Sequence, residues 1–531
     1  NINYKTMKYS LIKLSIFILL VTSCSDDIEE FNKNPNEPEV VPAYTVFNNA
    51  TVEYTTAIRG EFSAGRLTLP WLQYFGQNSY ADEDRFLYRE NTANNIYQDS
   101  YRAATDLKKV IELNTDEATS STQEAFGDNE NQIAASRIML AFIFHHLTDT
   151  FGDVPYYSFG TDDPTFQGLQ PEEFLSPVFA EQEKIYEDLI KELRAASDQL
   201  VTSEPVFTKG DNIFDGDAAK WKKFANSLIL RIANRQRNVD PAFANAAIDQ
   251  AVADGVMTSN ADNAVQNYST EDATASPFWQ AYIDRTDFGI TNTFVRALKG
   301  ENNSFNLDPR LFKMTAPSDV GIDAVLADTY NESKDEADYQ GIPYAFPIAQ
   351  QLPFSSYTFP SSNVLKPDYG EVLMEYAEVQ FILSERNGFS QAEYEEGVRA
   401  SMQKWGVEQS DINAFVNNLP PASQETVLDQ KYVALFMQSD EAWAEYRRTG
   451  FPEFLVLPNE SIQIDQIQLD ELPDDTDASY EFIPRVDIPE MPKRLRYPQT
   501  LQTLNGQNRS DAVDQLDGGD TVESPLFWDE N

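Results

Sequence analysis

The chain has 531 residues, with 86 Asp and Glu against 40 Lys and Arg, so its net charge is −46. This acidic balance excludes a nucleic-acid partner, because a phosphate backbone binds a basic face, and it disfavours anionic lipid headgroups. One cysteine, Cys24, and two histidines, His145 and His146, exclude a disulfide scaffold and a Cys/His zinc or iron–sulfur site. Hydrophobic residues make up 41 %, which is enough for a packed core.

The N-terminus has the features of an exported lipoprotein. Two lysines precede the short apolar run 14–21, which is typical of a secretory signal peptide. The run is too short to cross a bilayer, since a membrane span needs about 20 residues. Val21-Thr22-Ser23-Cys24 resembles the lipobox of bacterial lipoproteins, in which the cysteine becomes the acylated N-terminus. We therefore expect a signal peptide over 1–23 and lipidation of Cys24.

A polar segment over 24–42 is predicted to be the lipidated tether. Its acidic run 25–30 resembles the signal that directs Bacteroidetes lipoproteins to the outer face of the outer membrane. A merely solvated tether is the alternative interpretation of the same run. The proline-rich end of the segment, up to Pro42, indicates that the folded part begins at about residue 43.

Helical periodicity dominates much of the remaining chain. Ile185, Leu189 and Leu193, for example, recur every four residues, as in an amphipathic helix. Such patterns predict four helix pairs, at about 91–150, 180–237, 371–405 and 424–449. Helix pairs that stack to bury their inner faces are typical of tetratricopeptide-like repeats, although no clean 34-residue repeat is visible.

Two long stretches lack this periodicity. Gly, Pro, Ser, Asn and aromatic residues dominate 241–370, which predicts a large irregular, loop-rich insertion, and 452–531 is loop-rich as well. We expect a single domain from 43 to 531. Its predicted fold class is mainly α, with tetratricopeptide-like helix pairs and an insertion that builds a ligand-binding site.

Seven short segments occur in a characteristic order after the lipobox. They include Leu147-Thr148-Asp149-Thr150-Phe151-Gly152-Asp153-Val154-Pro155-Tyr156 and Glu441-Ala442-Trp443-Ala444-Glu445-Tyr446-Arg447-Arg448-Thr449-Gly450. The others lie at 31–36, 216–233, 308–311, 394–402 and 492–498. In this order they resemble the SusD/RagB family of outer-membrane nutrient-binding lipoproteins. The resemblance extends from Cys24 almost to the end of the chain.

The resemblance implies a binding protein without catalytic residues or a cofactor. Family members sit at the cell surface as lids on a SusC-like TonB-dependent transporter and capture oligosaccharides, or peptides in RagB-like members. It implies a lipid-anchored location at the outer membrane, with contact to the membrane only through the lipid. A structural calcium ion stays possible in so acidic a chain, but the sequence does not place one, and no metal ligands are predicted.

Sugar recognition needs flat aromatic rings beside polar groups that satisfy hydroxyls, presented on loops. Two segments qualify as tentative ligand-binding sites. The first contributes Trp71, Tyr80, Asp82 and Arg85, and the second contributes Trp279, Tyr282, Asp284 and Arg285. A helix that continues through Trp71 would instead place that ring in the core. A third aromatic segment, 354–359, qualifies less well because it lacks charged partners.

Other conspicuous residues have simpler structural interpretations. Helical spacing places Trp221, Trp405 and Trp443 in the core, and an apolar helix makes both histidines packed rather than reactive. Asp149, Asp153, Arg231, Arg447 and Arg448 are expected to pair or cap within the fold. The aspartates at 211, 215 and 217 do not have EF-hand spacing, so turn and capping roles are expected for them.

Three other functions stay open at this point. A peptide-binding lid differs from a glycan-binding lid only in its ligand. A surface glycoside hydrolase would need two carboxylates about 5–10 Å apart across a cleft, and no segment isolates such a pair. A pure interaction scaffold is also compatible with helical repeats, which commonly bind peptides on a concave face.

Overall fold

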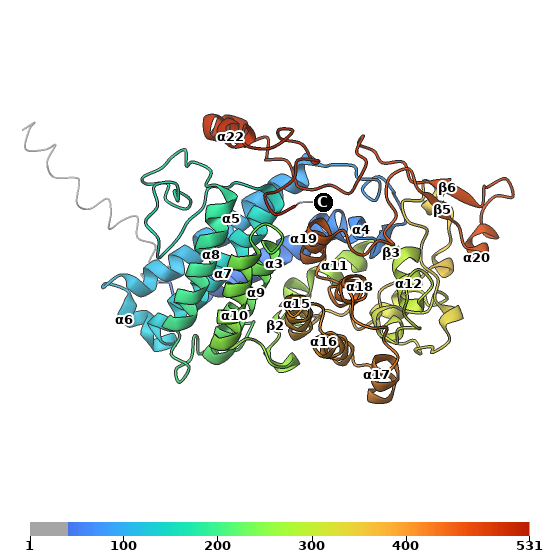
Figure 1. Cartoon of the computed structure of the whole chain (residues 1–531), viewed down its shortest axis with the longest axis horizontal. Coiled ribbons are helices and arrows are strands. Elements are labelled where there is room, and N and C mark those ends of the chain that lie inside the picture. Colours follow the sequence, from blue (N-terminus) through green and yellow to red (C-terminus); the bar gives the residue numbers. More distant parts are fainter. Residues whose placement is uncertain (1–40, 530–531) are drawn as a thin grey trace, which may run out of the picture. The chain divides into compact units, whose positions relative to one another are not determined.

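The computed structural model of the chain describes residues 41–529 (Figure 1). The signal peptide, Cys24 and nearly all of the tether lie outside these residues, so the predictions for them stay predictions. The unit described below begins at Ala43. Within the described residues, no helix combines the length and the apolar character needed to cross a membrane.

A first group of long helices packs in chain order. Each helix contacts the next along the sequence, and α7 also contacts α9. Figure 1 shows these helices lying side by side in blue, cyan and green. We call this group the helical array; it comprises α3 (Ala43–Arg59), α5 (Glu90–Thr115), α7 (Asn129–Phe151), α8 (Gln182–Gln199), α9 (Ala218–Arg235) and α10 (Pro241–Asp254).

A second group of helices follows later in the chain. Helix α15 packs on α16 and α18 and also contacts α9 of the helical array, whereas α19 packs on the short helix α4. The bounds are α4 (Thr68–Trp71), α15 (Tyr376–Arg386), α16 (Gln391–Lys404), α17 (Gln409–Val416), α18 (Gln424–Ala434) and α19 (Ser439–Thr449).

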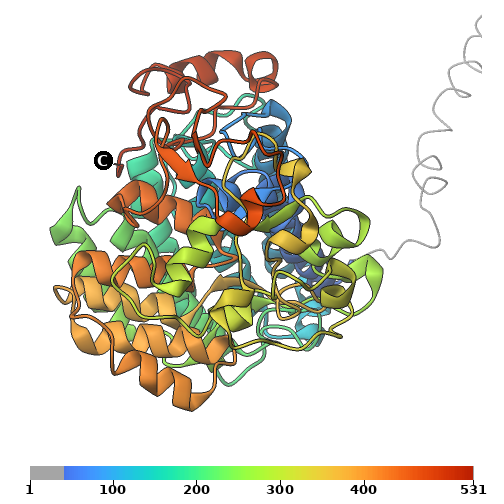
Figure 2. The same ribbon diagram turned by 90° about the vertical axis from the view of Figure 1, so that its right-hand side faces the viewer.

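The remaining chain consists of short helices and loops, and Figure 2 looks onto the side that carries α12, α20 and the β5–β6 pair. The short helices are α6 (Ser120–Gln123), α11 (Pro277–Asp284), α12 (Asn292–Lys299), α13 (Leu311–Met314), α14 (Ile322–Leu326), α20 (Gln466–Leu469), α21 (Leu501–Leu504) and α22 (Gly506–Val513). Three antiparallel two-stranded sheets join distant segments. They pair β1 (Phe75–Gln77) with β3 (Phe288–Ile290), β2 (Ala264–Gln266) with β4 (Glu371–Met374), and β5 (Ser461–Gln463) with β6 (Ser479–Glu481).

The mainly helical prediction is confirmed, with corrections to individual elements. Residues 371–374 form strand β4 rather than the start of a helix, because they pair with β2. The region from 241 begins with helix α10, not with loops: Asp240 caps it and Pro241 opens it. Its alanine-rich face, which packs on α9, has too little hydrophobic contrast to be recognised from periodicity.

The last predicted helix pair is wrong as a pair. Its two helices are consecutive in the chain, but α18 packs on α15 and α16, and α19 on α4. Helix α3, which the periodicity did not reveal, packs on α5 and opens the helical array.

A buried network of ion pairs joins the two helix groups. Arg231 and Arg235 of α9 pair with Glu378 of α15 and Glu441 of α19, with N–O distances of 2.6 Å in both pairs. Arg448 of α19 contacts both oxygens of Glu385 at 2.8 Å. Because removal of one partner would leave a buried charge uncompensated, these residues are structural.

Electrostatics within this network favour the ionised form of Glu445. Burial acts to raise the pKa of Glu445, but Arg448, Lys431 and Arg235 together hold that pKa well below its usual value. Arg447, whose pKa burial lowers to about 10, donates from Nη1 to the backbone oxygens of Asp149 and Lys493. The structural roles predicted for Asp149, Arg231, Arg447 and Arg448 are thus confirmed.

Candidate functional site

Strands β1 and β3 bring the two predicted ligand-binding segments together. Phe75 lies opposite Ile290, and Gln77 lies opposite Phe288, although more than 200 residues separate them in sequence. The backbone N–H of Asn78 continues the pairing by donating to the carbonyl oxygen of Asp287 at 2.9 Å. The loop after β1 and the segment before β3 therefore leave the sheet at the same end.

Tyr80 and Arg285 meet at this end of the sheet. A terminal nitrogen of Arg285 donates to the Tyr80 hydroxyl at 2.9 Å, and it contacts Asp287 at the same distance. The hydrogen bond to Tyr80 and the Asp287 carboxylate raise the pKa of Arg285. The ring of Tyr80 is 47 % exposed, so it presents an aromatic surface beside a fixed cation. Both residues were predicted as ligand contacts.

The third aromatic segment packs against the same sheet. Tyr357 packs against Gly289 of β3 so closely that a Cβ atom there would lie 2.7 Å from its ring, and Asn78 lies beside its hydroxyl. Tyr357 and Phe359 are buried, whereas Phe354 is 49 % exposed and its ring centroid lies 6.1 Å from that of Tyr357. Phe354 is the ring of this segment that a ligand can reach.

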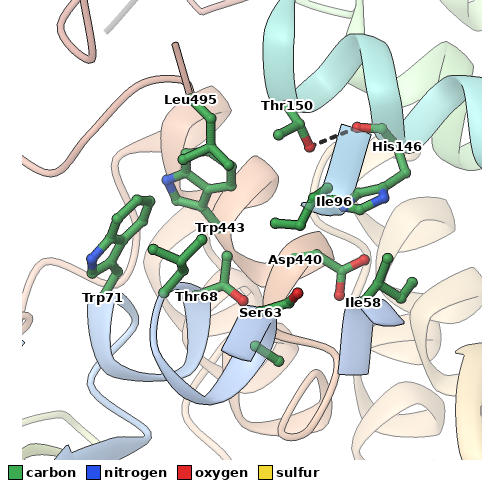
Figure 3. A pocket seen from close by; sticks show the side chains of 12 residues that line it. Ile58, Ser63, Thr68, Trp71, Ile96, His146, Thr150, Asp440, Trp443 and Leu495 are labelled. Carbon is green, nitrogen blue, oxygen red and sulfur yellow. Dashed lines mark hydrogen bonds between the residues drawn. The ribbon is translucent and has the colours of Figure 1, made fainter. Parts of the chain in front are cut away.

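Trp71 does not present its ring to a ligand. Its side chain is buried at the end of α4, where it packs edge-on against Trp443 at 5.4 Å between centroids (Figure 3). The cavity beside it measures about 20 Å³. That is room for one water molecule, whereas ligand pockets measure roughly 300–1,000 Å³. The alternative interpretation of Trp71, a core residue, is correct because its ring is buried, although α4 ends at Trp71 rather than continuing through it.

The second predicted segment divides between core and surface. Tyr282 is buried, packs on Phe278 and donates its hydroxyl to the Phe288 carbonyl oxygen at 3.0 Å, so it is wrong as a ligand contact. Trp279 is half-buried, and Ile283, one turn further along α11, is 46 % exposed. Asp284 ends α11, and its side chain lies outside what the structure describes.

Asp82 and Arg85 hold the loop after β1 in position. Asp82 accepts a hydrogen bond from Nε of Arg485 at 2.6 Å, and Nε of Arg85 donates to the carbonyl oxygen of Ile483 at 2.7 Å. Burial and the nearby Arg485 lower the pKa of Arg85. Asp82 and Arg85 were predicted as ligand contacts. In the structure they bind residues of the C-terminal segment, and not Tyr80 or Arg285.

A buried carboxyl beneath the same loop escaped the sequence analysis. Asp84 accepts from the backbone N–H of Gln77 at 2.8 Å, and the hydroxyl of Tyr344 donates to its carbonyl oxygen at 2.7 Å. Burial raises the pKa of Asp84 well above its usual value. Nothing in the local sequence distinguishes Asp84 from its acidic neighbours, because its burial depends on the distant Tyr344.

The remaining predictions concern packing and metal binding. His145 is buried and His146 is half-buried, with the Tyr54 hydroxyl 2.9 Å from Nδ1 of His146, whose pKa burial lowers to about 3. Trp221, Trp405 and Trp443 are buried as predicted. Asp211 accepts from Nε1 of Trp221 at 2.7 Å and Asp217 caps α9, which confirms turn and capping roles. Within residues 41–529, no cluster of three or more His, Cys, Asp or Glu side chains is arranged to hold a metal ion.

Comparison with known proteins identifies the family. The family model SusD-like_2, described as starch-binding and associating with the outer membrane, matches residues 35–469. A second model, the Susd and RagB outer membrane lipoprotein, matches residues 421–529. The chain therefore belongs to the SusD-like family, as the seven sequence segments indicated. No curated protein matches the chain.

Solved structures share this fold at low sequence identity. A chitin-binding protein is 22 % identical, with a TM-score of 0.70 over 92 % of this chain and 100 % of that chain. A chitin-binding SusD homolog from Flavobacterium johnsoniae is 20 % identical, with a TM-score of 0.65 over 92 % and 98 %. A SusD homolog from Bacteroides uniformis is 22 % identical, with a TM-score of 0.66 over 92 % and 99 %.

Proposed function

We propose that this protein is a cell-surface glycan-binding lipoprotein. The observation that carries the proposal is the convergence of three distant segments on the β1–β3 sheet. There the exposed ring of Tyr80, the guanidinium of Arg285 and the exposed ring of Phe354 belong to neighbouring segments. Aromatic faces stack on the apolar C–H faces of sugars, and a fixed polar group binds their hydroxyls.

The ligand class follows from charge and from relatives. A net charge of −46 disfavours strongly anionic polysaccharides, so a neutral glycan is the better partner. Two structural relatives carry chitin-binding in their names, which makes oligomers of N-acetylglucosamine the first ligands to test. A peptide, as in a RagB-like lid, is the alternative ligand for the same surface.

Family membership supports the cellular setting that we propose. The protein would be anchored at the outer membrane through a lipid on Cys24 and would face the cell surface. It would act there as the lid of a SusC-like TonB-dependent transporter, closing over captured oligosaccharides for import. In this role it binds and releases its ligand without turnover, so we propose that it is not an enzyme.

Calorimetric titration of the purified protein tests the ligand class. Neutral, amino-sugar and acidic oligosaccharides and a peptide digest form the panel. Binding to a glycan that falls at least tenfold in Tyr80→Ala supports the proposal. Phe159→Ala is the matched control, because Phe159 is a 41 % exposed ring outside the three segments. Heat from peptides alone would move the protein to the peptide-binding class, and hydrolysis products in the glycan samples would contradict the non-enzymatic role.

A further inference from the structure

A separate hollow is lined by Pro277, Gln280 and Ala281 of helix α11, in the part of the helix that precedes Arg285. It measures about 390 Å³ and lies between α3, the single-turn π-helix Glu61–Gly65, α5 and α11. Its lining combines one aromatic ring with two carboxylates and two amides, namely Phe62, Glu61, Asp99, Asn95 and Gln280. Of these residues, only Gln280 belongs to one of the three segments described above, because it lies on α11.

Phe62 is held as an open platform beside this hollow. Its ring is 59 % exposed although the guanidinium carbon of Arg66 lies 4.6 Å from the ring centroid. Arg66 in turn contacts Glu61 at 2.8 Å and Glu83 at 3.8 Å. One face of the ring is therefore covered by a cation that carboxylates fix in place, and the other face is free for a ligand. A ring already fixed in place loses little conformational entropy on binding.

The backbone that presents Phe62 has an uncommon conformation. The N–H of Gly65 donates to the carbonyl oxygen of Gly60 at 3.3 Å, which closes a π-helical turn around Phe62. Such turns are rare and occur frequently at functional sites. A Cβ atom on Gly60 would lie 2.8 Å from the Thr56 carbonyl oxygen, and Gly60 also lies near Pro277 of α11. The π-helical turn therefore packs against α11.

The amides of the hollow have acceptor and donor groups suited to hydroxyls. The Gln280 side-chain nitrogen donates to the backbone oxygens of Asp272 and Ala275, at 2.8 and 3.3 Å, which leaves its amide oxygen to accept from a ligand. Asn95 lies exposed on α5, four residues before Asp99 and therefore on the same helix face. This combination of ring, amides and carboxylates resembles the chemistry proposed for the site at Tyr80.

Helix α11 connects the hollow with Tyr80. Its eight residues extend for about 12 Å, with Pro277 at the hollow and Arg285 just past the other end. At 100° per residue, Trp279 and Ile283 lie about 100° around the helix from buried Phe278 and Tyr282 respectively, between this buried side and Gln280. Arg66, which covers the Phe62 ring, also contacts Glu83, three residues after Tyr80 in the chain. This contact is a second connection between the hollow and the segment of Tyr80.

We infer that the hollow beside Phe62 is a second sugar subsite, and that one oligosaccharide runs along α11 from Tyr80 to Phe62. This inference rests on the proposed glycan-binding function and deepens it, because it makes the ligand a chain rather than a short terminal unit. Affinity should then rise with chain length until both ends of α11 are covered.

The experiment is a calorimetric length series with chito-oligosaccharides, from the disaccharide to the hexasaccharide. Phe62→Ala is expected to weaken hexasaccharide binding about tenfold, or about 1.4 kcal/mol, and to leave disaccharide binding unchanged. Tyr80→Ala is expected to weaken both. Phe159→Ala is the control, because the guanidinium carbon of Arg137 lies 4.8 Å from its ring centroid, which matches the arrangement at Phe62. Asn95→Ala, an exposed change on α5, tests the same subsite should Phe62→Ala unfold.

The outcomes separate this inference from the proposed function. If no oligosaccharide or other glycan binds the unaltered protein, the proposed function fails and this inference fails with it. If glycan binds but the hexasaccharide binds no better than the disaccharide, the subsite is contradicted and the function stands. Equal losses for both lengths in Phe62→Ala, or equal losses in Phe62→Ala and Phe159→Ala, likewise contradict the subsite.

Discussion

The helical array and the three binding segments are held in place by different means. In the array, long helices bury whole faces, as α7 does between its neighbours, and enclosed ion pairs such as Arg235–Glu441 join the array to the second helix group. The binding segments meet through a three-residue strand pair and through close contacts such as Tyr357 on Gly289. Rings in the array are mostly enclosed, whereas Tyr80 and Phe354 are about half exposed.

This contrast indicates a division of labour. Stability is distributed over many contacts in the array, whereas the recognition that we propose depends on a few contacts between segments that are distant in sequence. Changes in the array should therefore affect unfolding alone, whereas changes in the binding segments should affect ligand binding with a smaller effect on unfolding.

Breaking the buried ion network should have the largest effect. Arg448→Ala removes the guanidinium that contacts Glu385 and Glu445 and leaves both buried carboxylates undercompensated. We expect a loss of about 3–5 kcal/mol of unfolding free energy, measured by denaturant titration. The control is Lys334→Ala, which breaks an exposed pair with Asp411 and should change stability little. A loss as small as that of the control would contradict the role of the network.

Gly289→Ala tests the packing of Tyr357 against β3, which holds two of the binding segments together. The new Cβ atom would lie 2.7 Å from the ring of Tyr357, so either the ring or β3 must shift. Overpacking of this kind costs about 1–3 kcal/mol. We expect a moderate fall in denaturation midpoint together with weaker glycan binding. Unchanged binding in a destabilised variant would mean that Tyr357 does not position the site. Gly321→Ala, where a Cβ atom meets open space, is the control.

Stability should depend on pH through Glu371 of β4. Burial raises the pKa of Glu371 to about 8 from 4.5, although Arg59 and Lys404 oppose the shift. Between these values the folded state binds the proton and the unfolded state does not, so this contribution is present below pH 4.5 and is lost as pH rises through about 8. Relative to the unaltered protein, Glu371→Gln should gain in thermal midpoint from pH 5 to pH 9. If the thermal midpoints of the variant and the unaltered protein changed with pH in parallel, the raised pKa of Glu371 would be contradicted.

Tyr80→Phe should have the smallest effect. It keeps the exposed ring and removes the hydroxyl that accepts from Arg285. An exposed hydrogen bond contributes about 0.5 kcal/mol, so glycan affinity should fall about twofold, with the unfolding midpoint unchanged. A loss as large as that of Tyr80→Ala would show that the hydroxyl, rather than the ring, recognises the ligand.

Local patterns predicted the parts of the fold that local forces determine. Helices with strong apolar stripes, such as α8, were found because spacing alone defines their buried face. Strand β4 was missed because its conformation depends on pairing with β2, about 100 residues earlier. For the candidate site, the local sequence did not separate exposed rings from buried ones. Trp71 and Tyr282 differ from Tyr80 only in what distant residues pack on them.

The sequence by itself determined that this chain is an acidic, mainly helical member of the SusD-like family with aromatic, loop-rich segments. Composition, helical spacing and the order of short segments are local properties, and each can be read without knowing any contact. Only the tertiary structure decided which rings face solvent, that Tyr80 and Arg285 meet at one end of a sheet, and that Tyr357 packs against the same sheet. Burial is a property of neighbours in space, and here those neighbours are hundreds of residues apart in the chain.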